Sequence, residues 1–199
     1  MAYTGQTISN PITGERITFL KTARETQGQL LVFDCRVTPG GSALPPHVHT
    51  RQVERLTVLF GVLGVRRGSE TFTLRPGQGI VPPPQVAHQW WNAGEGDMRM
   101  RVEVMPAGNL EDVLEALCAL AAEGATSRDG MPRDPFHLAT LARSSETYHP
   151  GVPVWMQKSI LRLASPVAWL LGYDRDFATY RTPGTWPEGR VSSRQDSCR

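Results

Sequence analysis

Two histidines and a glutamate in the segment Gly41–Gly61 have side chains and a spacing that could bind a metal ion. His47 and His49 are separated by one residue, and residues i and i+2 of an extended strand point to the same face. Glu54 follows beyond a short bend and offers an anionic oxygen. By itself the His-x-His pair is a weak signal, because buried or surface histidines with ordinary hydrogen bonds give the same pattern.

A third histidine, His88, stands on an expected strand that is entered through a proline-rich turn. Three neutral imidazoles and one carboxylate suit Fe(II), Mn(II), Ni(II), Cu(II), Co(II) or Zn(II) and leave positions open for water or substrate. Magnesium and calcium are disfavoured because they prefer oxygen ligands. We therefore expect one divalent transition-metal ion to be bound by His47, His49, Glu54 and His88.

Three residues close to these ligands are predicted to contact a substrate. Arg51 and Gln52 lie in the bend between two ligands, where they could orient a substrate carboxylate or support a ligand. A solvated loop is the alternative interpretation of both. Trp90 shares the face of His88 by strand alternation and could wall an aromatic or apolar substrate, although large aromatic side chains more often fill the core.

The part of the chain that must position these residues has the pattern of short strands separated by glycine and proline turns. Apolar runs are found at 30–37, 56–60, 71–74 and 98–105, and Gly64–Gly68 is interpreted as a hairpin connection. Many short strands at this spacing predict an antiparallel sandwich or barrel.

After Pro106 the hydrophobic period becomes helical. Helices are predicted from Asn109, as N-cap, to Gly124, over 136–143 and over 153–171. The third is rich in large apolar residues, but Lys158 and Arg162 interrupt it, so no membrane span is expected. It could pack on the barrel, form a dimer face or lie on a membrane surface.

Composition and charge limit the class of protein. The 199 residues carry 21 basic and 19 acidic side chains, a formal net charge of +2, with no concentrated basic face. Nucleic acid is therefore not an expected partner. The N-terminus lacks the pattern of a secretory signal, and the three cysteines have no pairing pattern, which predicts a cytoplasmic protein with reduced thiols.

The residues singled out above resemble the two motifs of the cupin superfamily. The first motif, G-x5-H-x-H-x4-E-x6-G, is matched by Gly41, His47, His49, Glu54 and Gly61, and the second, G-x5-P-x-G-x2-H-x3-N, by Gly77, Pro83, His88 and Asn92. Gln85 stands where the second motif has glycine. This departure concerns the turn before His88 and leaves the ligand itself untouched.

The resemblance implies a mainly β fold, a double-stranded β-helix or jelly-roll cupin barrel, followed by C-terminal α-helices. We expect residues 1–106 to form the barrel with N-terminal strands, 107–189 a helical extension packed on it, and 190–199 a flexible tail. A homodimer is also expected, because cupin barrels often pair through a sheet.

Cupins include dioxygenases, isomerases, decarboxylases, lyases, cyclases and binding proteins, so the fold leaves the reaction open. The leading hypothesis is an oxygenase that uses Fe(II) and acts on a small aromatic or enol substrate. A redox-neutral isomerase, lyase or cyclase is the alternative, with Glu54 leaving the metal to move a proton. A non-catalytic protein that binds a small ligand is the third hypothesis.

Overall fold

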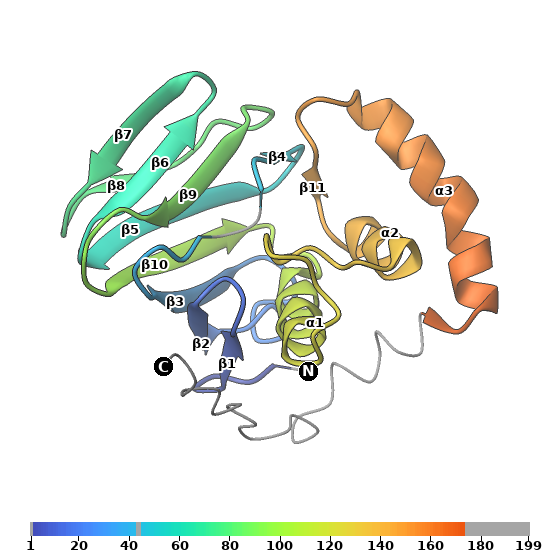
Figure 1. Ribbon diagram of the computed structural model, residues 1–199, viewed down its shortest axis with the longest axis horizontal. Helices are drawn as coiled ribbons and strands as arrows, with labels where there is room; N and C mark the ends of the chain where they lie inside the picture. Colours follow the sequence, from blue (N-terminus) through green and yellow to red (C-terminus); the bar gives the residue numbers. More distant parts are fainter. Residues whose placement is uncertain (1, 43–44, 174–199) are drawn as a thin grey trace, which may run out of the picture.

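The computed structural model describes residues 2–42 and 45–173 (Figure 1). The strands are β1 (Thr7–Asn10), β2 (Glu15–Lys21), β3 (Leu31–Val37), β4 (Val48–His49), β5 (Val53–Phe60), β6 (Leu63–Arg67), β7 (Glu70–Leu74), β8 (Gly79–Ile80), β9 (His88–Asn92), β10 (Met98–Met105) and β11 (Thr147–Tyr148). The helices are α1 (Leu110–Ala122), α2 (Pro135–Ser144) and α3 (Val154–Leu170). The predicted mainly β fold with C-terminal helices is confirmed.

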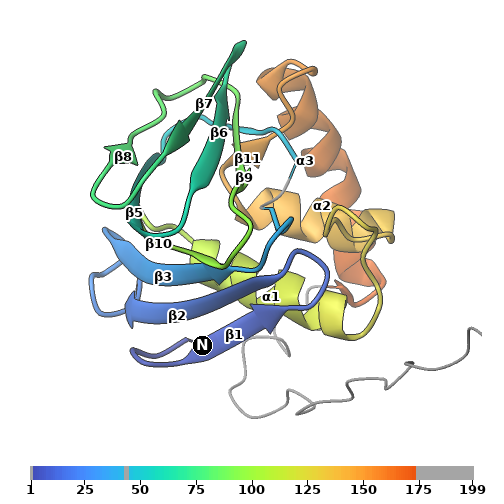
Figure 2. The ribbon, with the colours of Figure 1, turned by 60° about the vertical axis from the view of Figure 1, so that its left-hand side comes forward.

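The strands pair antiparallel in three sheets. A six-stranded sheet has the order β1-β2-β3-β10-β5-β8, a three-stranded sheet the order β7-β6-β9, and β11 pairs with β4. Figure 2 shows the three-stranded sheet above β3, β2 and β1. Isolated backbone bridges link β9 of the three-stranded sheet to the segment before β4, with Ser42 opposite Trp91 and His47 opposite His88.

Strand β10 lies in the middle of the six-stranded sheet, between β3 and β5, and its side chains alternate between core and solvent. The inward side chains are at most 1% exposed: Met98, Met100, Val102 and Val104. On the outward face, Arg99 and Arg101 pair with Asp34 of β3 at 2.6 and 2.9 Å. Because Val104 is the register partner of Glu54, this strand fixes the depth at which the glutamate enters the molecule.

The predicted hairpin connection at Gly64–Gly68 is wrong, because most of this stretch lies in β6. Val65 is 1% exposed, and β6 pairs with β7 on one side and β9 on the other. A Cβ atom on Gly64 would come within 2.3 Å of the indole of Trp91. The glycine therefore permits close packing in a strand, and the turn begins only at Gly68.

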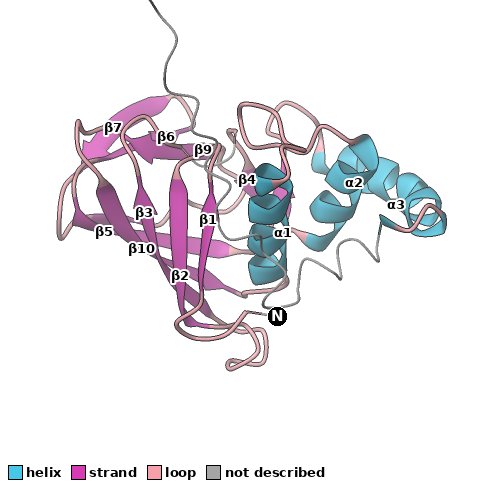
Figure 3. Cartoon of the chain, turned by 60° about the horizontal axis from the view of Figure 1, so that its bottom comes forward, coloured by secondary structure: helices cyan, strands magenta, loops and turns pink. Residues whose placement is uncertain are grey.

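The three helices follow the sheets at one side of the molecule (Figure 3). Helix α1 packs beside β1, and Cys118 on α1 belongs to the main core. Asn109 precedes α1 without a capping side-chain bond, whereas Asp134 caps α2 by accepting from two backbone N–H groups. The predicted division of the chain at residue 106 stays a prediction. The predicted flexible tail, 190–199, lies outside the described residues.

Helix α3 packs against α2 and buries little of its own surface. Ala168 is its one buried residue among those described, while Trp155 is 71% and Leu163 78% exposed. This exposed apolar face leaves the dimer and membrane-surface hypotheses open. Within the described ranges, no helix has the length and apolarity needed to cross a membrane.

Gln85 adopts the backbone conformation for which the cupin motif has glycine. Its φ is +64°, in the left-handed region that costs a residue with a side chain roughly 1–2 kcal/mol. Its N–H still donates to the carbonyl oxygen of His49 at 2.9 Å. The turn before His88 therefore forms despite the departure from the motif.

We predict that Gln85→Gly raises the free energy of unfolding by up to about 1 kcal/mol, because relief of the left-handed strain exceeds the added entropy of the unfolded chain. Gln85→Val should lower it by about 1–2 kcal/mol, since β-branched residues tolerate positive φ poorly. Urea denaturation of both variants tests this. A valine variant as stable as the unaltered chain would contradict it.

Candidate metal centre

The site begins with a backbone pair between two histidines. The N–H of His47 donates to the carbonyl oxygen of His88 at 3.1 Å, and the N–H of His88 donates to that of His47 at 2.9 Å. Residues that exchange both bonds lie directly opposite each other in an antiparallel pair. The two imidazole centroids are 4.6 Å apart, and His49, two residues further on, brings its ring within 5.0 Å of His47 and 5.2 Å of His88.

All three imidazoles are oriented by backbone carbonyl groups. Nδ1 of His47 lies 2.9 Å from the carbonyl oxygen of Pro45. The corresponding distances are 3.3 Å from His49 to Glu146 and 3.1 Å from His88 to Val86. A carbonyl oxygen only accepts, so each Nδ1 carries the proton and donates it. Each Nε2 is then the nitrogen available to bind a metal.

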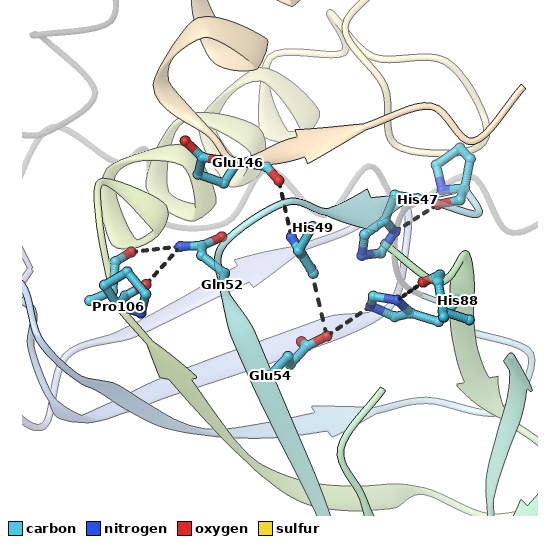
Figure 4. A network of polar contacts seen from close by, with 10 residues as sticks. His47, His49, Gln52, Glu54, His88, Pro106 and Glu146 are labelled. Carbon is cyan, nitrogen blue, oxygen red and sulfur yellow. Dashed lines mark hydrogen bonds and ion pairs between the residues drawn. The ribbon is translucent and has the colours of Figure 1, made fainter. Parts of the chain in front are cut away.

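Glu54 completes the cluster from β5 (Figure 4). Its Oε2 lies 3.2 Å from Nε2 of His88 and 3.9 Å from Nε2 of His49. One potential ligand atom from each of the four residues lies within 4.8 Å of the other three. This is the mixed nitrogen and oxygen set that transition metals bind, so the residues present fit such an ion. The structure brings together all four predicted ligands, and their role as ligands stays a proposal.

Burial and mutual charge set the protonation of the cluster. Burial, together with His88 and His49, lowers the pKa of His47 to about 4, and burial also lowers the pKa of His49. Burial opposes ionisation of Glu54, but the hydrogen bond from His88 and the three imidazoles hold its pKa below the ordinary value. Near neutral pH two imidazoles are thus uncharged and the carboxylate is ionised, as metal binding requires.

His88 differs from the other two histidines. Burial alone would lower its pKa, but the hydrogen bond to Glu54 and the negative charge of that carboxylate outweigh burial and raise it. Protons therefore compete most strongly with a metal at this histidine.

The C-terminal half supplies a support that the sequence analysis missed. Strand β11 pairs with β4, with Thr147 opposite His49, and the preceding residue, Glu146, contributes the carbonyl that orients the His49 ring. The Glu146 carboxylate accepts hydrogen bonds from Thr50 and Arg51. No local sequence pattern predicts this pairing, because the partners are nearly a hundred positions apart in the sequence.

A small cavity of about 80 Å³, the inner cavity, lies against the cluster. His47, His49 and Glu54 line it, together with apolar side chains from the sheet and α1. Trp90 also lines it and is 5% exposed, in agreement with the inward direction predicted for this residue.

The other two predicted substrate contacts are occupied by protein groups. Gln52 donates from Nε2 to the carbonyl oxygens of Pro106 and Ala107, at 3.0 and 3.1 Å. The guanidinium of Arg51 pairs with Glu146. Neither residue is among the described residues that line the inner cavity, and their contact with a substrate stays a prediction.

A second carboxyl group lines the inner cavity and was not singled out from the sequence. Glu15 accepts a hydrogen bond from Thr13 at 2.6 Å, and the thiol of Cys35 lies 3.9 Å from its other oxygen. Burial, opposed by these two bonds, raises the pKa of Glu15 to about 7. The period-two row Glu15, Ile17, Phe19 on β2 could have revealed it, since the latter two are buried.

We predict that His49→Ala and His88→Ala each weaken metal binding by more than the ~10–100-fold typical of losing a supporting group around a ligand. His149→Ala is the matched control, because His149 lies outside the cluster. Metal content after purification and dialysis measures the effect. Unchanged content in the first two variants would refute the assignment of ligands.

We also predict a pH effect of Glu15 on stability, measured without metal. Because the pKa of Glu15 is about 7 in the folded chain and 4.5 ordinarily, the folded state retains a proton that the unfolded chain releases. Stability should therefore fall as pH rises from about 4.5 to 7, by at most about 3 kcal/mol. In Glu15→Gln this part of the fall should vanish, and identical pH profiles would contradict the prediction.

Comparison with known proteins places this site in a family. The profile of the cupin domain matches residues 33–105. A search of the curated proteins gave no match.

Solved structures that match part of this chain include three proteins. A predicted oxalate decarboxylase from Thermotoga maritima is 19% identical, over 51% of this chain and 91% of that chain, with a TM-score of 0.45. A sugar phosphate isomerase from Silicibacter pomeroyi is 22% identical, over 47% and 60%, with a TM-score of 0.41. The polyketide cyclase RemF from Streptomyces resistomycificus is 22% identical, over 47% and 66%, with a TM-score of 0.42. This chain thus spans less than two thirds of the length of the latter two.

The matched segment contains the backbone pair of His47 and His88, the ring of His49 and the carboxylate of Glu54. Both predicted motifs fall within the matched segment. Gln85 is the one position at which the second motif is not met, and its backbone has the positive φ typical of glycine. Residues 33–105 of this chain match the cupin domain.

Proposed function

We propose that this cupin is a metal-dependent enzyme that acts on a small organic molecule. The observation that carries the proposal is the convergence of three imidazoles and one carboxylate, of which His47, His49 and Glu54 line the inner cavity. A bound divalent transition metal would supply Lewis-acid or redox chemistry at this point. Fe(II), favoured from the sequence, is one of several ions that the same ligands suit.

Within this function we favour redox-neutral chemistry with proton transfer, as in an isomerase, lyase or cyclase. Two carboxyl groups line the inner cavity and have different surroundings. Glu54 is held among three imidazoles as an ionised ligand, whereas Glu15 lies outside the four-residue cluster. With a pKa of about 7, Glu15 can either accept or donate a proton near neutral pH. It is better suited than Glu54 to the acid–base role that the sequence analysis gave to Glu54.

Oxygenation is the second candidate. Its support is the apolar lining of the inner cavity, which includes Trp90, Phe33 and Val102 and would limit the access of water to the cluster. A homodimer is a further proposal, supported by the exposed apolar side chains of α3.

The decisive experiment measures the metal content of protein purified without added metal and then turnover of small enol, ketone and aromatic substrates with and without oxygen. Turnover without oxygen, retained when zinc replaces the native ion, is the expected result. Turnover that requires oxygen and consumes it in proportion to product would establish the oxygenase instead. Absence of bound metal after purification and reconstitution would refute the enzyme proposal.

We predict that Glu15→Gln lowers kcat roughly 10²–10⁴-fold, the range for loss of a general acid or base, while the metal content stays unchanged. Glutamine keeps the shape of the side chain and an oxygen for Thr13, so the cavity should persist. Cys118→Ala, at the same cavity, is the control and should leave most activity. Full activity of Glu15→Gln would exclude Glu15 from proton transfer.

A further inference from the structure

The inner cavity is too small for the body of most substrates. Its volume of about 80 Å³ corresponds to two or three water molecules, since each takes roughly 30 Å³ in the liquid. Small-molecule sites usually measure ~300–1,000 Å³. A substrate larger than a few atoms must therefore place most of its volume elsewhere while its reacting end reaches the cluster.

A second, larger cavity of about 500 Å³, the outer pocket, adjoins this site. His47 and Thr147 line both the inner cavity and the outer pocket. One belongs to the metal cluster and the other to β11, the strand that joins the C-terminal half to β4. The two cavities are thus adjacent, and these two residues form the wall that they share.

Most of the outer pocket is built by the C-terminal half, beyond the segment that matches the cupin domain. Its lining is largely apolar, with Pro46 from the loop before β4 and with Met131, Leu138, Ala142, Ile160 and Leu161 from the helical region. None of the described residues that line it is a lysine or arginine, and Asp129 contributes a carboxylate. An anionic ligand would meet no lysine or arginine among these lining residues and would be repelled by Asp129, although Lys158 lies over the ring of Tyr148, with Nζ 5.3 Å from its centroid.

Hydrogen bonds hold the rim of the pocket in place. The Gln157 side chain on α3 donates to the carbonyl oxygens of His149 and Val152, at 2.9 and 2.7 Å, and accepts from the N–H of His149 at 3.0 Å. The N–H of Gly151 donates to Nδ1 of His149 at 3.1 Å. Because Nδ1 accepts this bond, the ring proton of His149 is on Nε2, and this residue has an N–H to donate.

We propose that the outer pocket binds the body of the substrate, and that this substrate is an uncharged, largely apolar molecule with a carbonyl or similar acceptor oxygen. The inference rests on the proposed function and adds a substrate class to it. The apolar lining takes the hydrocarbon part, His149 donates to an acceptor at the rim, and the reacting end passes between His47 and Thr147 to the metal ligands.

The test uses a neutral probe and its anionic partner, methyl 2-naphthoate and 2-naphthoate, with the full chain in equilibrium dialysis. The ester should bind saturably with a Kd below about 1 mM, and the carboxylate at least tenfold more weakly. Equal or tighter binding of the carboxylate would overturn the substrate class. Absence of saturable ester binding would overturn the pocket assignment.

Matched variants on one helix locate the binding. Leu161→Trp fills the outer pocket and should weaken ester binding at least tenfold, whereas Leu163→Trp, on the exposed face of α3, should change it less than twofold. Ala142→Trp fills the pocket from α2 and provides a second test if Leu161→Trp unfolds. His149→Phe should weaken binding about three- to tenfold through loss of one hydrogen bond. Binding that is lost in Leu163→Trp and kept in both filled variants would assign the probe to the surface of α3 and overturn the proposal.

Proximity to the metal ligands is measured separately. In protein loaded with Mn(II), the proton resonances of the bound ester should broaden, and the broadening should disappear in Leu161→Trp. Ester that binds without broadening would refute the substrate role. Failure of Mn(II) to bind, seen in the metal content, would instead refute the proposed function, while dialysis against metal-free protein still reports on the pocket.

Discussion

The short backbone bridge between His47 and His88 is the constraint on which the rest of the site depends. It places two imidazoles side by side from segments that are distant in the sequence. Strand alternation then adds His49 on the same face. Backbone carbonyl groups fix each ring through Nδ1, so the orientation of the three nitrogens that could bind a metal depends on main-chain geometry.

Different neighbours give two glutamates of the same cavity opposite pKa shifts. Glu54 accepts a hydrogen bond from His88 and lies among three imidazoles, and their combined interaction outweighs the cost of burying its carboxylate. Glu15 accepts hydrogen bonds only from the hydroxyl of Thr13 and the thiol of Cys35, which offset less of the cost of burying its charge. Its neutral form is therefore favoured, and its pKa is raised. Residue type alone could not divide these roles, because the difference lies in what surrounds each carboxyl group.

The C-terminal half is joined to the cupin domain at the site itself. Strand β11 pairs with the strand that carries His49, and Glu146 supports that histidine while its carboxylate holds Thr50 and Arg51. The helices beyond it form most of the outer pocket. The cupin domain thus supplies the groups that suit a metal, and the helical half shapes the space that leads to them.

The sequence by itself determined the four clustered residues, the inward direction of Trp90 and the change from strands to helices after Pro106, because period-two and helical patterns and ligand spacing are local properties. It misplaced the turn at Gly64–Gly68, since the packing of Gly64 against Trp91 is a contact between strands. Tertiary structure alone decided the pairing of β11 with β4, the raised pKa of Glu15 and both cavities. These features depend on contacts between distant segments, whose free energies no local pattern encodes.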